Sequence, residues 1–212
     1  TQSSDTFPAV MYFVADTQPG LRLYTEVHQL PMASDRALAA IQALVSDNSP
    51  AVDPDYTNLW ALKPNRVLSL QRDGGSATVD LELAGLNVGS EGEARAIDQI
   101  LWTLTAADPS ISRMKLLVNG EAVETIAGHV DATGWFERGP EYGVMATVTV
   151  DAPASSSTVK SPVVATGTAC TFEANVVWAL YQDNKKLKGG ATTAGEACPV
   201  RSPWRVELGK LK

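Results

Sequence analysis

The sequence predicts two domains, an α+β domain followed by an all-β sandwich. Two helical patterns, each preceded by a pair of alternating strands, predict the first domain, and evenly spaced β-rich runs from residue 144 onward predict the second. A chain of 212 residues has room for two domains of ordinary size. We place the first domain at 8–128, a linker at 129–142 and the second domain at 143–212.

The first domain begins with a predicted hairpin and helix. An apolar run at 11–14 and an alternating segment at 21–27 flank a turn at Gln18-Pro19-Gly20. Apolar residues then recur at helical spacing over 35–45, after Ser34 as the expected N-cap. The sequence Asn48-Ser49-Pro50 ends this helical pattern.

A second hairpin and a second helix follow. Residues 66–83 alternate around an Arg72-Asp73-Gly74-Gly75 turn, which predicts two antiparallel strands. The sequence Ser90-Glu91-Gly92-Glu93 predicts a capping box, in which Ser90 and Glu93 would satisfy each other's backbone amides. The helical pattern ends near Asp108-Pro109.

A third hairpin, around Asn119-Gly120, completes the order β-β-α-β-β-α-β-β. Two amphipathic helices need an apolar sheet face to cover. We therefore expect one sheet covered by a layer of two helices.

The second domain contains both cysteines of the chain, Cys170 and Cys198. Five β-rich runs separated by turns predict an antiparallel sandwich, and they lie at 144–150, 161–167, 174–181, 187–193 and 204–208. An even cysteine count confined to one segment predicts a structural disulfide, which persists only outside the reducing cytosol. A loop of about 29 residues gives roughly 3–4 kcal/mol in the chain-entropy model.

Charge differs between the two halves. Residues 1–140 hold 9 Lys and Arg against 18 Asp and Glu, a net of −9, whereas residues 141–212 hold 8 against 6, a net of +2. The acidic half argues against nucleic acid or anionic lipid as a partner. We interpret Lys185, Lys186 and Lys188 as a solvated hairpin turn. The first residues lack the features of a secretory signal, so a disulfide implies that an export signal has been removed.

No pattern of residues predicts catalysis. His28 lies in or just after a predicted strand, which favours a structural or surface role over a catalytic one. His129-Val130-Asp131 lacks the further ligands that a zinc site needs. Asp53-Pro54-Asp55 fits a turn beside a helix better than a calcium site. There is no Gly-x-Ser-x-Gly elbow and no phosphate-binding glycine loop. We predict no enzyme activity, no cofactor and no metal.

Aromatic residues provide the remaining candidates for ligand or partner contacts. Trp60 precedes a strand, either as a cap over the sheet edge or as a platform for stacking a sugar. Trp135 and Phe136 lie in the predicted linker, where we expect them to pack in the interdomain joint, with an exposed partner site as the alternative. The core is the expected position of the remaining tryptophans, Trp102, Trp178 and Trp204.

The first domain resembles the GerMN domain of bacterial sporulation and germination proteins over roughly residues 10–128. The resemblance rests on Tyr12-Phe13-Val14, Val67-Leu68-Ser69-Leu70, Ser90-Glu91-Gly92-Glu93-Ala94 leading into Leu101-Trp102-Thr103-Leu104-Thr105, and Leu117-Val118-Asn119-Gly120. It implies a non-enzymatic module similar to the ring-building motifs of envelope assemblies. No catalytic residues of the family carry over.

The second domain resembles Gmad2, an immunoglobulin-like module often found after GerMN. The resemblance rests on the segment 168–176 together with Gly195-Glu196-Ala197-Cys198-Pro199 and Pro203-Trp204. The cysteines are only 28 positions apart, unlike those of antibody domains, so we expect the bridge to tie a loop to a strand end. The family normally continues beyond Leu208 into further strands, and their absence would leave an open sheet edge.

These observations predict a non-catalytic, extracytoplasmic protein-interaction or assembly module of a bacterial cell-envelope lipoprotein. Its expected partners are envelope proteins or further copies of itself, and its only expected membrane contact is a removed N-terminal lipid anchor. The alternative is a glycan- or peptidoglycan-binding protein that uses Trp60 or the pair Trp135 and Phe136. A paired-carboxylate hydrolase is a third and weaker hypothesis.

Overall fold

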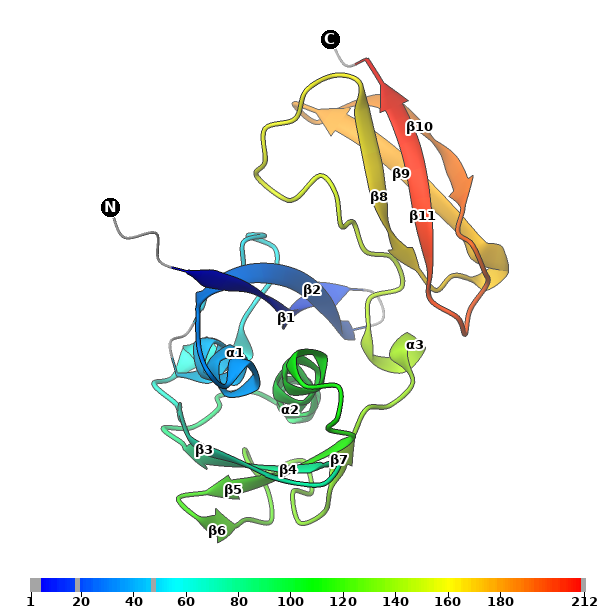
Figure 1. Cartoon of the computed structure of the whole chain (residues 1–212). Helices are drawn as coiled ribbons and strands as arrows, with labels where there is room; N and C mark the ends of the chain where they lie inside the picture. Colours follow the sequence, from blue (N-terminus) through cyan, green and yellow to red (C-terminus); the bar gives the residue numbers. More distant parts are fainter. Residues whose placement is uncertain (1–4, 18–19, 47–48, 211–212) are drawn as a thin grey trace. The chain divides into compact units, whose positions relative to one another are not determined.

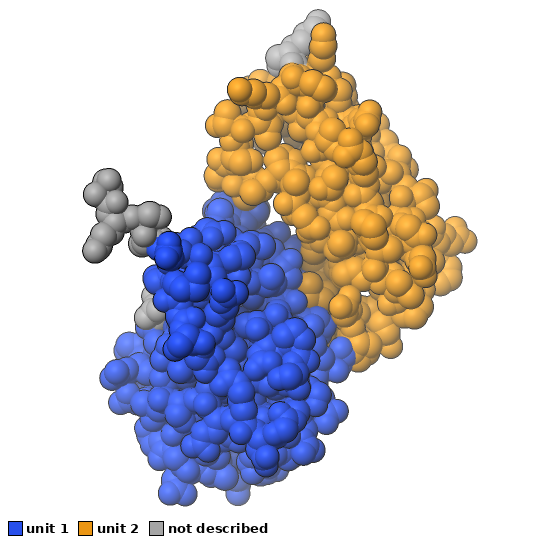
Figure 2. Space-filling view, viewed as in Figure 1, with its two compact units in different colours: residues 1–139 blue, residues 140–212 orange. Residues whose placement is uncertain are grey.

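The computed structural model describes residues 5–17, 20–46 and 49–210. The chain forms two compact units, residues 1–139 and 140–212, which Figure 2 colours separately. The first unit extends to Gly139, so the segment 129–139, which we predicted as part of a linker, belongs to it.

The first unit opens with the predicted hairpin, formed by β1 (Thr6–Thr17) and β2 (Gly20–Pro31). The strands pair in an antiparallel register from Thr6↔Pro31 to Thr17↔Gly20 and form a sheet of their own. The predicted turn residues Gln18 and Pro19 lie outside the described residues. One face of the hairpin covers the helices, so residues at the start of β1 are alternately exposed and buried, whereas residues 11–14 are all buried.

Helix α1 (Arg36–Val45) begins one residue later than the predicted cap implies. The N-cap is Asp35 rather than Ser34, and its carboxylate accepts a hydrogen bond from the Leu38 amide at 3.0 Å. The helix ends at the C-cap Ser46, and the predicted stop residue Asn48 lies outside the described residues. The short 3₁₀ helix η1 (Leu59–Leu62) follows.

The first unit contains a second, five-stranded sheet. Its strands are β3 (Arg66–Asp73), β4 (Ser76–Glu82), β5 (Arg113–Val118), β6 (Glu121–Ala122) and β7 (Phe136–Glu137), in the order β3-β4-β5-β6, with β7 also paired to β5. Strands β4 and β5 are parallel, and α2 (Ser90–Ala107) is the crossover between them. The predicted hairpins over β3–β4 and β5–β6 are present.

The two helices lie between the two sheets, as Figure 1 shows, so this unit has three layers. Our expectation of a single sheet covered by helices was wrong, although the α+β class and the predicted order of the main elements are confirmed. Helix α2 explains the difference, because its buried residues include Ala96, Ile97, Ile100 and Leu101, which cover more than one side of a helix. A helix with so wide an apolar surface needs a second covering layer.

The start of α2 also differs from the prediction. Its N-cap is Gly89, with no side-chain cap, so the capping box formed by Ser90 and Glu93 is absent. The Glu93 carboxylate is fully buried and accepts four backbone N–H bonds, from Ile126, Ala127, His129 and Val130, at 2.7–3.1 Å. These four donors satisfy the carboxylate better than the one amide of a capping box would.

Arg138 binds the far end of α2. Its Nε donates to Thr105 Oγ1 at 2.6 Å, and a terminal amino group donates to the Trp102 carbonyl at 2.8 Å. The guanidinium carbon lies 4.3 Å from the centre of the Trp102 ring. The last residues of the first unit are thereby fixed to its longest helix.

The second unit is a small β-sandwich. It contains α3 (Glu141–Val144), β8 (Val163–Ala169), the 3₁₀ turn η2 (Phe172–Ala174), β9 (Asn175–Gln182), β10 (Lys185–Thr193) and β11 (Ser202–Gly209). Antiparallel pairs β8–β11 and β9–β10 face each other (Figure 1). Their core contains Ala169, Ala174, Val176, Ala194, Trp204 and Val206. The predicted antiparallel sandwich is confirmed.

Two local predictions in this unit were wrong. The run 144–150 forms the end of α3 and an isolated bridge, Val148↔Ala169, instead of a strand. The lysines Lys185, Lys186 and Lys188 lie in β10, and the hairpin turn is formed by Asp183 and Asn184 at positive φ. Asp and Asn tolerate that conformation better than lysine does.

Candidate functional site

Trp60 is a core residue. Its side chain is 0% exposed, and its indole nitrogen donates to the Ala96 carbonyl of α2 at 2.8 Å. Because this side chain is fully buried, Trp60 is not available as the sugar-stacking platform that was the alternative to a cap over the sheet edge. Tertiary packing of η1 against α2 supplies the hydrogen-bond partner that a buried indole needs.

Trp135 and Phe136 do not form a shared aromatic surface. Phe136 lies in β7 opposite Met114, which is fully buried, and is itself half-buried. Trp135 immediately precedes β7 and remains 43% exposed. Both belong to the first unit, at the edge of its five-stranded sheet, and only Trp135 offers an exposed ring.

Arg113 accompanies Trp135 on the surface. Its guanidinium carbon lies 4.6 Å from the centre of the Trp135 ring, and its Nε donates to Ser76 Oγ at 2.7 Å. Ser76 lies in the neighbouring strand β4, and only 7% of its surface is exposed. The sequence offers no local signal for this contact, because β7 brings together residues that are 22 positions apart.

Arg113 and Trp135 lie on a polar side of the five-stranded sheet. The register places Glu137 opposite Arg113, Thr78 opposite Lys115, and Gln71 opposite Thr78. Residues opposite each other in a sheet project to the same side. Met114 and Leu116, which alternate with Arg113 and Lys115, are buried. The side opposite these apolar residues therefore carries charged and hydrogen-bonding groups.

A shallow hollow of about 460 Å³ lies at the start of α1. Arg72 spans it and donates to both carboxylate oxygens of Asp35, at 2.8 and 2.9 Å, and through Nε to Asp108 at 3.0 Å. The hydrogen bond from Arg72 lowers the pKa of Asp35, and the hydroxyl of Ser110, followed by Arg72, lowers the pKa of Asp108. Arg72, Asp35 and Asp108 therefore already pair with one another in this hollow.

The histidine and aspartate motifs have structural roles. Glu26 accepts hydrogen bonds from the amides of Val52 and Asp53, each at 2.8 Å, and lies 2.9 Å from His28 Nε2. Burial, together with the Asp53 carboxylate, raises the pKa of the stacked Tyr24 and Tyr56 phenols. Within the described part of the chain, no group of three or more His, Cys, Asp or Glu side chains is placed to hold a metal ion.

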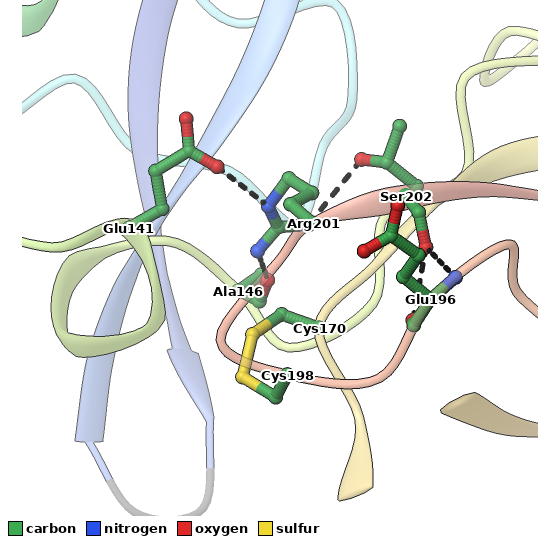
Figure 3. Close-up of a disulfide and its surroundings, with 8 residues drawn as sticks. Glu141, Ala146, Cys170, Glu196, Cys198, Arg201 and Ser202 are labelled. Carbon is green, nitrogen blue, oxygen red and sulfur yellow. Dashed lines mark hydrogen bonds and ion pairs between the residues drawn. A yellow bond between two sulfur atoms is a disulfide. The ribbon is translucent and has the colours of Figure 1, made fainter. Parts of the chain in front are cut away.

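The disulfide joins Cys170 and Cys198, with 4.5 Å between their Cα atoms (Figure 3). Cys170 immediately follows β8, and Cys198 lies in the loop between β10 and β11, so the predicted link between a loop and a strand end is confirmed. The Cys198 amide also donates to the Thr171 carbonyl at 3.0 Å. The two loops are therefore linked covalently and by a hydrogen bond.

Several interactions in Figure 3 hold the surroundings of the disulfide in place. Arg201 donates to the Ala146 carbonyl and lies 3.5 Å from the Glu141 carboxylate. Ser202 accepts from the Glu196 amide at 2.6 Å and donates to the Glu196 carbonyl at 2.9 Å. These contacts order the loop that carries Cys198.

The second unit also exposes large apolar side chains in η2 and β9. Phe172 is 87% exposed, and the next two residues, Glu173 and Ala174, both have positive φ. On β9, Val177 is 76% exposed and Tyr181 is 60% exposed. Val177 and Tyr181 project from the same side of β9, and contiguous exposed apolar residues are typical of a surface that contacts another molecule.

Two family models match the chain. The Germane model, described as sporulation and spore germination, matches residues 10–124, and the Gmad2 model, described as an immunoglobulin-like domain of bacterial spore germination, matches residues 147–210. No curated protein matches the chain. None of the described helices combines the length and the apolar composition needed to cross a bilayer.

Several solved structures align with this chain at low sequence identity. The tandem GerMN domains of GerM from Bacillus subtilis align at 17% identity and a TM-score of 0.51, over 66% of this chain and 47% of that one. The first GerMN domain of the same protein aligns at 20% identity and a TM-score of 0.50, over 60% and 94%. A putative lipoprotein from Clostridium perfringens aligns at 20% identity and a TM-score of 0.44, over 69% and 97%.

The alignment covers about half the length of the tandem GerM structure, and the similarity to the GerM domains concerns the fold alone. The Germane match covers more than half of the 212 residues, and the Gmad2 match covers most of the second unit. The chain belongs to the Germane (GerMN) family of sporulation and spore germination proteins, with a Gmad2 immunoglobulin-like domain after the GerMN domain.

Proposed function

We propose that this chain is a non-catalytic, extracytoplasmic module that makes protein contacts or assemblies in the bacterial cell envelope. The observation that carries the proposal is the exposed apolar surface of the second unit. Phe172, Val177 and Tyr181 keep most of their surface accessible, although each is large enough to contribute substantially to a core. We call these three residues the apolar surface.

The geometry of β9 supports a contact role. Val177, Ala179 and Tyr181 alternate with the more buried Val176 and Trp178, so they project to the outer side of the sandwich. Their neighbours on β10 include Ala191 opposite Val177 and Gly189 opposite Ala179. The Lys186 side chain lies over Gly189, so the accessible apolar area on this side of the strand pair is that of Val177 and Tyr181.

The chemical groups of the chain support a non-catalytic role. The charged cluster at Arg72 is paired internally, and Glu93 is enclosed by backbone amides. The disulfide supports a location outside the cytosol, because such bonds persist in oxidising compartments.

The proposal predicts that changing the apolar surface abolishes partner binding without unfolding the protein. The variant F172S/V177S/Y181S tests this, since all three side chains are exposed. The measurement is crosslinking of the purified chain in an envelope extract, with identification of crosslinked peptides, together with light scattering of the chain alone. We expect the wild type to crosslink through peptides around 172–181 to one identified protein or to itself, and the variant to lose that crosslink.

The matched control is V27S/M32S/V52S, which changes three exposed apolar residues of the first unit. It should retain the crosslink. A wild-type chain that is monomeric at all concentrations and gives no crosslink through 172–181 would leave the proposal without support. The same conclusion follows if both triple variants lose binding equally.

A further inference from the structure

We propose that Arg113 and Trp135 form a subsite for an acidic sugar, with the guanidinium binding the carboxylate of the sugar and the indole stacking on its ring. N-acetylmuramic acid, a cell-wall sugar with a lactyl carboxylate, has this chemistry. The subsite lies in the first unit and uses none of the residues of the apolar surface, so it stands or falls independently of the protein-contact proposal.

Arg113 is held in one orientation before any ligand arrives. Its Nε donates a hydrogen bond to Ser76, and its guanidinium carbon lies over the Trp135 ring. Within residues 5–17, 20–46 and 49–210, neither terminal amino group has a hydrogen-bond or ion-pair partner. A guanidinium fixed in this way loses little side-chain entropy on binding, and two amino groups in a fork match the two oxygens of a carboxylate.

Trp135 supplies an apolar surface beside that charge. It keeps 43% of its surface exposed while Arg113 lies against it, so a second group can contact the ring. The C–H face of a pyranose is apolar, and its hydroxyl edge is polar. An exposed aromatic ring with charged groups next to it suits a molecule that has both.

The surrounding side chains favour a sugar over a protein partner. Thr78, Lys115, Gln71 and Glu137 project from the same side of the sheet as Arg113. The centre of a protein interface is depleted in charged residues, whereas this surface is rich in charged groups and hydrogen-bonding groups. Hydroxyl and amide groups of a sugar can bond to such side chains. The disulfide of the chain further suits a compartment in which cell-wall sugars occur.

Glu137 sets the expected strength of binding. It lies directly opposite Arg113 in the register, and the carboxylate of a ligand would have to approach it. The first 140 residues also have a net charge of −9, which repels anions at long range. We therefore expect a dissociation constant of order 1 mM, typical of a single subsite, and tighter binding when Glu137 is neutralised.

The test is a titration of the purified chain with N-acetylmuramic acid, followed by the ¹H–¹⁵N signals of the five indole groups. Trp135→Phe assigns the signal of Trp135. We expect a saturable shift of that signal, and at least fivefold weaker binding of N-acetylglucosamine, which has the same ring without the carboxylate. Arg113→Gln and Arg113→Lys should both remove the preference for the acidic sugar, since neither variant has a planar fork of donors. Glu137→Gln should bind the acid more tightly.

Two control variants change residues outside the subsite. Arg66→Gln removes an exposed arginine from the same sheet and should leave the titration unchanged, as should Phe172→Ala in the second unit. Folding of every variant is checked by circular dichroism. Equal binding of the neutral sugar, no saturable shift, or equal binding of N-acetylglutamate, which offers a carboxylate without a sugar, would each overturn the proposal.

Discussion

Glu93 fixes the segment that leads from β6 toward β7. Its carboxylate accepts bonds from four amides of residues 126–130, a stretch without regular secondary structure. Buried backbone amides require partners, and this stretch has no strand to provide them. One side chain of α2 therefore replaces a ladder of backbone hydrogen bonds.

Replacing Glu93 with Gln should destabilise the first unit by about 2–5 kcal/mol, because an amide keeps one acceptor oxygen and turns an NH₂ group toward amides that are themselves donors. Urea denaturation monitored by circular dichroism measures this loss. The control is Glu91→Gln, which affects an exposed bond to the Leu21 amide at 3.0 Å and should cost less than about 1 kcal/mol. Equal losses in the two variants would contradict the role assigned to Glu93.

The role of a residue was predictable from the sequence only where it depends on neighbouring residues in the chain or on amino-acid composition. The disulfide was predictable because the chain has two cysteines in one segment, and the burial of Trp102 was predictable from the helical spacing of apolar residues. The role of Glu93 and the hydrogen-bond partner of Trp60 were not predictable, because their partners are distant in the chain, at 126–130 and at Ala96. A pattern of a few neighbouring residues in the sequence does not indicate partners that are so far away in the chain.

At the scale of elements, Arg72 joins three ends of secondary structure. Arg72 itself lies near the end of β3, Asp35 is the N-cap of α1, and Asp108 is the C-cap of α2. The bidentate contact with Asp35 also occupies the carboxylate that caps α1. The cluster therefore ties both helices to one edge of the five-stranded sheet.

The lowered pKa values of Asp35 and Asp108 predict a pH dependence of stability. A carboxylate whose pKa is lower in the folded state stabilises the fold above its unfolded pKa of about 4 and loses that contribution as pH falls through the folded value. Arg72→Gln should raise the pKa of Asp35 toward its ordinary value, so that less stability remains to be lost below about pH 4. The pKa of Asp108 should stay low, because Ser110 is its main cause.

At pH 7 the same substitution should cost about 1 kcal/mol or less, because the groups are partly exposed and screened by water. Thermal unfolding of wild type and variant from pH 2.5 to 7 measures both effects. The control is Arg66→Gln, which breaks an exposed pair with Glu82 at 3.5 Å. It should leave the decrease of the unfolding temperature below about pH 4 unchanged. Parallel pH curves for wild type and Arg72→Gln would contradict the role of this cluster.

The elements themselves were largely predictable, but their pairing was less so. Alternation and turn chemistry located β1 to β5 and both long helices. The parallel pairing of β4 with β5 was not predicted, since it joins strands separated by a helix and leaves no turn motif. The separation of β1–β2 into its own sheet depends on which face of each helix is covered, a property of the assembled unit.

At the scale of the whole molecule, only one of the two units contains a disulfide. The bond closes a loop between positions 170 and 198, and the chain-entropy model assigns about 3–4 kcal/mol to a loop of that length. The second unit is also small, and a small core supports little stability of its own. Its stability should therefore depend on the redox state of the solution.

Reduction should lower the unfolding temperature of the second unit and leave the transition of the first unit unchanged. Calorimetry with and without a phosphine reductant measures this, and the buried indole of Trp204 reports on the second unit in the NMR spectrum. The double variant C170A/C198A should reproduce the effect of reduction. If the transition of the first unit shifts as well, the two units do not unfold independently.

The attachment of Arg138 to α2 has a mechanical consequence. Tension applied through the polypeptide between the units enters the first unit at Gly139, the residue after this arginine. The load is then borne by two side-chain hydrogen bonds to α2 and by the short pairing of β7 with β5, ahead of any other part of that unit. When such a protein is stretched, extension should begin with detachment of this segment, while the layers around the helices remain folded.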